Sequence, residues 1–328
     1  MGKSSAAPPR LEALVKMAVP LLQRAEAEHP RRGRGRHPVM PDWVMGTLIM
    51  VAVLRRKSKS GQYAFLKAHR RDLQAWLGVS RFPDRSTYLD RYRRAYRLFQ
   101  AAIELQGKVA IAEGVAEARC VAVDRSLIRA AGPLWHMRQR KAGILPRGVD
   151  RDSTWTFSEY HGWLQGYGYE VVVTAPCRGI AFPLLASCDQ AHVREQHTFP
   201  SKIERLPDTT INVLADGGYD SNALAEAVEW TELGRRRTGR RFLCPARFHR
   251  APSRKWKSTR KRKFHRRLRE QRDNRLKRTR ERRLYARRGR SVEPFNVRFK
   301  HLFELHDGAW IVDWTTTARR SWHEFVLL

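Results

Sequence analysis

Two stretches of the sequence, CVAVD at residues 120–124 and INVLAD at residues 211–216, decide the fold. Each is a short apolar run that ends in an aspartate, and such runs are typical of the central strands of a sheet. Ligand sites of α/β sheets lie at the carboxyl ends of the strands. If these two strands are neighbours, Asp124 and Asp216 should therefore meet at one edge of the sheet.

The surrounding sequence predicts a mixed sheet flanked by helices. YGYEVVVT (167–174) and IAFPLLAS (180–187) indicate two strands joined by a turn around Pro176 and Gly179. A further short strand is expected at 241–246, and helices are expected at 195–205 and 221–231. This order of elements indicates an α/β domain over residues 116–328.

Residues 1–115 are expected to form a separate, all-helical domain. Apolar residues at helical spacing predict helices at 10–28, 41–54, 62–76 and 87–113, with a kink at Pro20 and a basic link at 30–38. Lys and Arg lie mostly outside the apolar stripes. Two interpretations remain open for this region, a small DNA-binding domain and a plain helical cap.

The charge of the chain indicates a polyanionic partner. Of 328 residues, 65 are Lys or Arg and 32 are Asp or Glu, which gives a net charge of +33. Nucleic acid is the commonest partner of so basic a protein. Residues 235–290 hold 27 Lys and Arg against three acids. With too few apolar residues for a core of its own, this segment is either a solvated helix or an arm ordered by DNA.

Several classes of protein are disfavoured. The four cysteines are too far apart for a zinc site or a disulfide framework, which suits a reducing compartment. The most apolar stretch, 44–54, is too short to span a bilayer. No glycine-rich phosphate loop or G-x-S-x-G turn is present, so no nucleotide cofactor is expected. His136 and His161 are expected in core or surface roles.

The paired aspartates point to metal chemistry. Two anions held close together need a cation, and hard divalent metals prefer oxygen ligands. A third carboxylate would allow two metal ions to be held for phosphodiester cleavage. An aspartate at a strand end is also a common helix N-cap or turn residue, which is the structural alternative for each position.

The stretch VLADGGYDS (213–221) resembles the second-aspartate motif of bacterial insertion-sequence transposases. Downstream, Tyr285, Arg288, Glu293 and Lys300 are similar to the Tyr-Arg-Glu-Lys signature of the cut-and-paste DDE transposases. The chain departs from that signature by one extra residue between Arg288 and Glu293. Arg287 or Arg290 is therefore an alternative to Arg288.

Two weaker matches accompany these motifs. SEYHGWLQGY (158–167) resembles a family stretch that precedes a Val-rich strand, although Gly168 stands where the family has a lysine. RSLI (125–128) fits the first-aspartate motif loosely. The resemblance covers about 119–304, and the N-terminal helices carry no family motif.

The resemblance implies an RNase H-like catalytic domain whose catalytic, metal-binding residues are Asp124, Asp216 and Glu293, with two Mg²⁺ or Mn²⁺ ions per site. Glu293 and Lys300 are seven residues apart, so on a helix they share one face. The residues expected to contact DNA are Tyr285, Arg288 and Lys300, and the basic group around a stacking tryptophan, Arg254, Lys255, Trp256 and Lys257.

The implied activity is cleavage at transposon ends and joining of the 3′-OH ends to target DNA. The implied partners are double-stranded DNA, comprising terminal inverted repeats and target, and a second copy of the chain on paired ends. The implied location is the bacterial cytoplasm, at the nucleoid, with no membrane. Two alternatives remain, a catalytically silent, transposase-derived DNA-binding protein and a general nucleic-acid chaperone.

Overall fold

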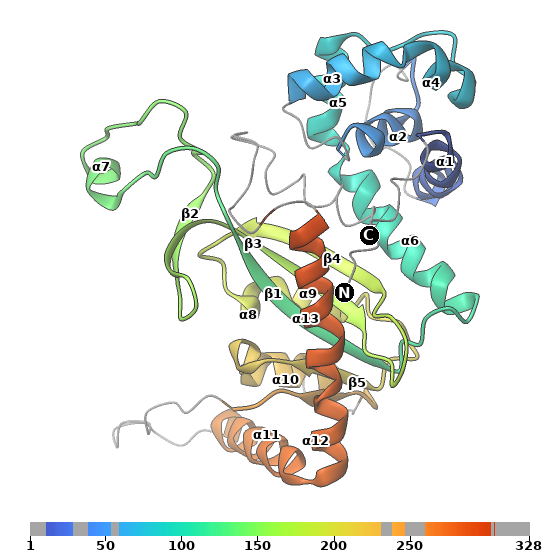
Figure 1. Ribbon diagram of the computed structural model, residues 1–328. Helices are drawn as coiled ribbons and strands as arrows, with labels where there is room; N and C mark the ends of the chain where they lie inside the picture. The colour runs from blue at the N-terminus through green and yellow to red at the C-terminus, as the bar shows by residue number, and fades with distance from the viewer. Residues whose placement is uncertain are drawn as a thin grey trace, which may run out of the picture.

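The computed structural model describes residues 11–28, 39–53, 59–230, 238–246, 260–302 and 305. The described part of the chain combines a helical region, a mixed sheet and three C-terminal helices (Figure 1). None of the helices in these ranges is long and apolar enough to cross a membrane. The predicted DNA contacts at residues 254–257 lie outside the described residues.

Six helices precede the first strand: α1 (Leu11–Glu28), α2 (Asp42–Val53), α3 (Lys59–Ala68), α4 (Arg70–Leu77), α5 (Arg85–Arg94) and α6 (Tyr96–Ala112). Residues 44–53 of α2 are all buried, because α1, α3, α5 and α6 pack around that helix. The single helix expected at 62–76 is two helices that meet at His69. The helix expected at 87–113 is likewise divided, at Ala95.

The sheet runs in the order β2-β3-β1-β5-β6, with β4 also paired to β3. Its strands are β1 (Cys120–Arg129), β2 (Thr154–Ser158), β3 (Gly162–Thr174), β4 (Pro183–Gln190), β5 (Asn212–Ala215) and β6 (Arg241–Leu243). Strands β1 to β4 form antiparallel pairs, whereas β5 is parallel to β1 and β6 is parallel to β5. The predicted mixed α/β sheet is confirmed, and β2 is an additional strand.

The position of Asp124 differs from the prediction. The parallel pairing of β1 with β5 ends at Val123 and Ala215, but β1 continues to Arg129 against β3. Asp124 therefore lies within β1, at the level where the neighbouring strand β5 ends. Asp216 follows the last residue of β5, as predicted.

The short helices around the sheet also differ from the expected ranges. The helix expected at 195–205 is two helices, α8 (Glu195–Thr198) and α9 (Pro200–Ile203), because Pro200 suits the first turn of a new helix but not a helix interior. Another short helix, α7 (Met137–Lys141), lies between β1 and β2. Helix α10 (Asn222–Glu229) follows the 3₁₀ turn η1 (Gly217–Tyr219).

The C-terminal helices are α11 (Arg260–Lys277), α12 (Thr279–Tyr285) and α13 (Arg287–Leu302). Helix α11 packs on α10 and β6, and Arg272 is buried there with its Nη2 2.8 Å from Asp220 Oδ1. Arg275 forms an ion pair with Glu229. This part of the basic segment is thus neither a fully solvated helix nor a free arm, because one face belongs to the body of the protein.

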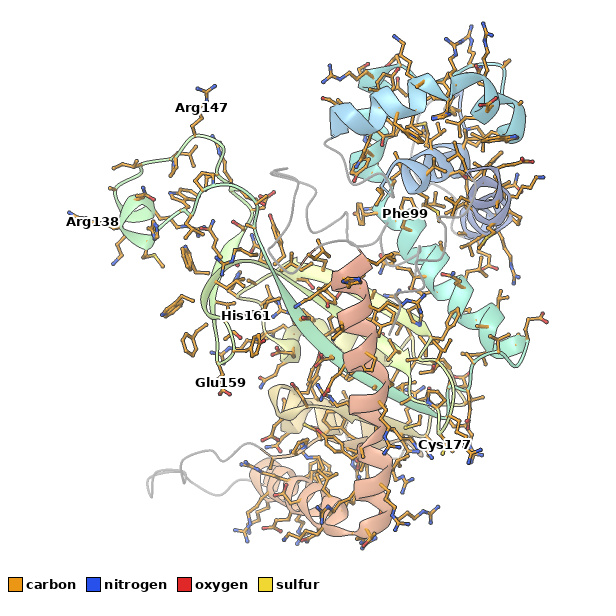
Figure 2. All side chains as sticks on the ribbon, in the orientation of Figure 1. Phe99, Arg138, Arg147, Glu159, His161 and Cys177 are labelled. Atoms are coloured by element: carbon orange, nitrogen blue, oxygen red, sulfur yellow. The ribbon has the colours of Figure 1, made fainter. Side chains whose placement is uncertain are left out.

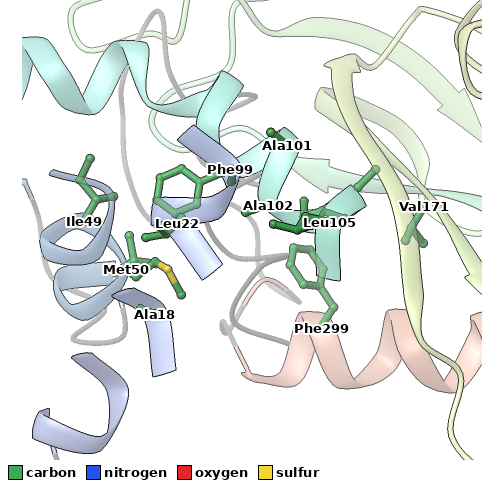
Figure 3. Close-up of a cluster of buried hydrophobic side chains, with 14 of the residues drawn as sticks. Ala18, Leu22, Ile49, Met50, Phe99, Ala101, Ala102, Leu105, Val171 and Phe299 are labelled. Atoms are coloured by element: carbon green, nitrogen blue, oxygen red, sulfur yellow. The ribbon is translucent and has the colours of Figure 1, made fainter. Parts of the chain in front are cut away.

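The largest hydrophobic cluster extends from the N-terminal helices to the sheet. Figure 3 shows Leu22 and Phe99 on the helical side, Leu105 on α6, and Phe299 of α13 near Val171 of β3. A second cluster fills the opposite face of the sheet. The N-terminal helices therefore share one core with the face of the sheet that α13 covers. The predicted domain boundary at residue 115 stays a prediction.

Candidate active site

The two aspartates lie on the same face of the sheet. Side chains alternate along a strand, and Ala122 on β1 and Leu214 on β5 both belong to the cluster beneath α13. Asp124 and Asp216 come two residues after these positions. Asp216 also caps η1, since its Oδ1 accepts a hydrogen bond of 2.8 Å from the backbone N–H of Gly218.

Helix α13 brings Arg288 and Glu293 to the aspartates. Nη2 of Arg288 is 2.7 Å from Asp124 Oδ1 and 3.7 Å from Asp216 Oδ2, and its Nη1 is 3.1 Å from Glu293 Oε1. The three predicted carboxylates therefore surround one guanidinium. Of the three arginines considered from the sequence, the structure places Arg288 at this position.

Asn296 is a member of the site that the sequence motifs did not indicate. Its amide donates a hydrogen bond of 2.7 Å to Asp124 Oδ2. Both carboxylate oxygens of Asp124 thus have a donor from α13, one from Arg288 and one from Asn296. The spacing is consistent with one helix face, because Asn296 lies eight residues after Arg288.

The charges of the site depend on one another. Burial raises the pKa of Asp124 to about 6, Arg288 opposes this shift, and the Asp216 and Glu293 carboxylates add to it. Burial also disfavours the charge of Arg288, but Asp124 and Asp216 outweigh that effect and raise its pKa. The guanidinium therefore keeps its charge and is the cation that lets these carboxylates lie together.

A cavity of about 370 Å³ opens beside the carboxylates. Asp124, Glu293, Asn296 and Lys300 line it, together with His161 from the turn before β3. Burial lowers the pKa of Lys300, and Asp124 opposes that shift. Glu293 and Lys300 were predicted to share one face of a helix, and both line this cavity, as does Asp124 of β1.

Two aromatic residues, Tyr285 and Trp230, lie at the ends of α12 and α10. Tyr285 is partly buried at the end of α12, where burial raises its pKa to about 12 and Arg288 opposes the shift. The ring of Trp230 contacts that of Phe264 edge-on, at 5.5 Å between centroids. Tyr285 is therefore close enough for the charge of Arg288 to affect its pKa, whereas Trp230 packs against α11.

A buried polar network supports the turn that carries Asp216. Glu170 of β3 is fully buried, and its carboxylate is 2.6 Å from Lys202 Nζ and accepts a hydrogen bond of 2.9 Å from the Tyr219 hydroxyl. Tyr219 is the last residue of η1, the turn that directly follows Asp216. The tyrosine of the VLADGGYDS motif thus anchors the aspartate turn to the sheet.

Gly168 has a local explanation. The Arg125 guanidinium lies across this glycine and would overlap a Cβ there. Nη2 of Arg125 donates to the carbonyl of Gln190 at 2.9 Å. A side chain at 168 would displace that contact, so Arg125 occupies the space that a lysine at 168 would need.

The donor set can be compared with what a metal ion requires. Among the residues that the structure describes, no three His, Cys, Asp or Glu side chains are arranged to hold a metal ion. The donors around Arg288 are nevertheless all carboxylate oxygens, which hard divalent cations prefer. The Arg288 guanidinium lies among these oxygens. The carboxylates therefore suit a divalent cation only if Arg288 takes a different position.

No family model, curated protein or solved structure matches this chain.

Proposed function

We propose that this protein is a DDE-type DNA transposase with an RNase H-like catalytic domain. The observation that carries the proposal is the meeting of Asp124, Asp216 and Glu293 around Arg288. These acids come from β1, the end of β5 and α13, so they are far apart in the sequence. A mixed sheet with two carboxylates on adjacent strands and a third from a packed helix supports the choice of fold.

The basic surface supports DNA as the substrate. Helices α11 and α12 carry exposed cations, and the chain has a net charge of +33. Such a surface holds phosphates without regard to base sequence. Acids grouped within so basic a protein are expected where a metal-dependent reaction takes place on a bound polyanion.

Asp124, Asp216 and Glu293 would hold Mg²⁺ or Mn²⁺. When bound, such ions supply an activated oxygen nucleophile and stabilise the leaving oxygen of a phosphodiester. Asn296 fixes the orientation of Asp124 through its hydrogen bond to Oδ2. Lys300, in the same cavity, would hold a phosphate of the DNA backbone.

The proposed reaction has two displacements at phosphorus. In the first, a water oxygen bonds to phosphorus and the bond to the 3′ oxygen breaks, which leaves a 3′-OH and a 5′-phosphate. In the second, that 3′-OH attacks a target phosphodiester and releases the target's own 3′ oxygen, which takes up a proton. The number of phosphodiester bonds is conserved in the second step, so no nucleotide cofactor is needed. We propose that two copies of the chain act on paired ends.

A second candidate is a catalytically silent DNA-binding protein derived from a transposase. The observation that favours it is Arg288 itself, which already neutralises the carboxylates. In that case the acids stabilise the fold and α11 to α13 bind DNA without cleaving it.

The Asp216→Asn variant separates these candidates, because it removes a charged ligand and keeps the size of the side chain. Strand cleavage of a plasmid that carries the DNA flanking the gene should fall by orders of magnitude with Mg²⁺ or Mn²⁺. Binding in a gel-shift assay should persist, since an anion beside the phosphates has been removed. Lys300→Ala is the matched variant, expected to weaken binding and to leave some cleavage at saturating DNA. Wild-type protein that binds this DNA but never cleaves it with either metal would favour the silent binder.

A further inference from the structure

The hairpin of β2 and β3 exposes aromatic side chains that a folded protein usually buries. Phe157, Tyr160 and Trp163 are 60%, 90% and 68% exposed. Phe157 and Trp163 face each other across the two strands, and their rings meet edge-on at 5.6 Å between centroids. The pair is held in place by the register of the strands, so its exposure is built into the fold. We call Phe157, Tyr160, His161 and Trp163 the aromatic hairpin.

The aromatic hairpin borders the cavity of the candidate active site. Tyr160 and His161 line the cavity of about 370 Å³ that Asp124 and Glu293 also line. The ring of Tyr160 contacts that of His161 at 4.7 Å between centroids. Exposed rings therefore occur at the wall of the cavity, in Tyr160 and His161, and on the adjoining strands, in Phe157 and Trp163.

The cavity wall carries two cations in addition to the carboxylates of Asp124 and Glu293. Arg129 and Lys300 line the same cavity. Burial lowers the pKa of His161, and the charges of Lys300 and Arg129 lower it further. Glu159 is an acid on this turn, and Figure 2 shows it at the end of the hairpin. Rings beside cations are suited to a partner with flat apolar groups joined by phosphates.

We propose that the aromatic hairpin stacks on unpaired bases of a DNA end while Arg129 and Lys300 hold the adjoining phosphates. The inference rests on the proposed function and specifies its substrate as DNA with unpaired bases next to the cleaved phosphate. Bases within a duplex cover one another's faces, whereas unpaired bases offer their faces to protein rings regardless of sequence. A second copy of this chain is a poorer occupant of this surface, because Arg129 and Lys300 of one copy would face the same cations of the other.

The test compares two DNA probes in the absence of divalent metal, so that cleavage plays no part. One probe is a blunt duplex, and the other is the same duplex with a single-stranded overhang that contains 2-aminopurine. Trp163→Ala in the full chain should lose about ten-fold in affinity for the overhang probe and keep its affinity for the blunt duplex. Trp163→Phe should retain most of the affinity. Ile180→Ala is the control, since Ile180 is 78% exposed on the β3–β4 turn.

The 2-aminopurine fluorescence gives a second readout. Wild-type protein should quench it by stacking, and Trp163→Ala should quench it less. Equal affinity of wild type and Trp163→Ala for the overhang probe would overturn the inference, as would equal losses on both probes. A change in oligomeric state with unchanged overhang binding would also overturn it, because the hairpin would then join two copies.

Failure of the proposed function has a different signature. If wild type never cleaves DNA with metal present, yet Trp163→Ala loses overhang binding without metal, the proposed catalysis fails and the aromatic hairpin still binds unpaired bases. If cleavage occurs and Trp163→Ala binds both probes like wild type, the hairpin inference alone fails.

Discussion

Replacing Arg288 with Met tests whether its cation stands in for metal at the carboxylates. The Arg288 side chain is 13% exposed and that of Asp124 is 16% exposed, so this ion pair is mostly buried. Removing one partner of such a pair costs about 3 kcal/mol or more. Asp216 and Glu293 are 43% and 58% exposed, and their contacts with Arg288 add little because solvent screens them.

We therefore expect Arg288→Met to lower the free energy of unfolding by about 3 kcal/mol in EDTA at neutral pH. Saturating Mg²⁺ or Mn²⁺ should recover most of this loss, because a divalent ion can then neutralise the same carboxylates. The measurement is urea unfolding of wild type and variant, with and without metal, together with Mn²⁺ titration by calorimetry. The variant should bind Mn²⁺ more tightly than wild type.

Arg290→Met is the matched control, since Arg290 is an exposed arginine on the same helix. Its effect should be within about 0.5 kcal/mol under both conditions. If metal leaves the deficit of Arg288→Met unchanged, and the variant binds no Mn²⁺, the carboxylates are not a metal site.

Three further changes have defined outcomes. The pKa of Asp124 is raised from 3.8 to about 6, so its carboxyl destabilises the fold above pH 6. The difference in unfolding free energy between wild type and Asp124→Asn, followed by urea unfolding without metal, should therefore shift in favour of wild type by up to about 3 kcal/mol as the pH falls from about 7 to about 4. Gly168→Ala should cost about 1–2 kcal/mol, and a double-mutant cycle should show that most of this cost disappears with Arg125→Ala. Replacing four exposed arginines with Gln should reduce the slope of log affinity for duplex DNA against log salt by about 3 to 4, and an unchanged slope would exclude phosphate contacts there. These four are Arg278, Arg280, Arg282 and Arg283.

The central strands were predictable because their apolar runs are short and end in a charged residue. The shared face of the two aspartates also follows from the sequence, since Asp124 lies two residues after Ala122, as Asp216 does after Leu214. The continuation of β1 beyond Asp124 was not predictable. Residues 125–129, RSLIR, lack a strict alternation of polar and apolar residues, and their pairing with β3 is set by the partner strand.

The contacts within the site were less accessible to sequence reasoning than its carboxylates. A helix pattern indicates which residues share a face, but it does not show what that face packs against. Arg288 was expected to hold a phosphate, and the structure instead directs it to three carboxylates. Asn296 has no motif of its own, and its role depends on how α13 crosses β1.

The carboxylate contacts of Arg288 are compatible with the phosphate contact that was expected for it. A guanidinium can bind carboxylates or phosphates with the same two nitrogens, and it binds whichever anions are less neutralised. In the structure, those anions are Asp124, Asp216 and Glu293. If a divalent ion neutralises these acids, as we propose, Arg288 loses its partners and a DNA phosphate becomes the stronger ligand. One residue would then link metal binding to DNA binding, and by reciprocity each would favour the other.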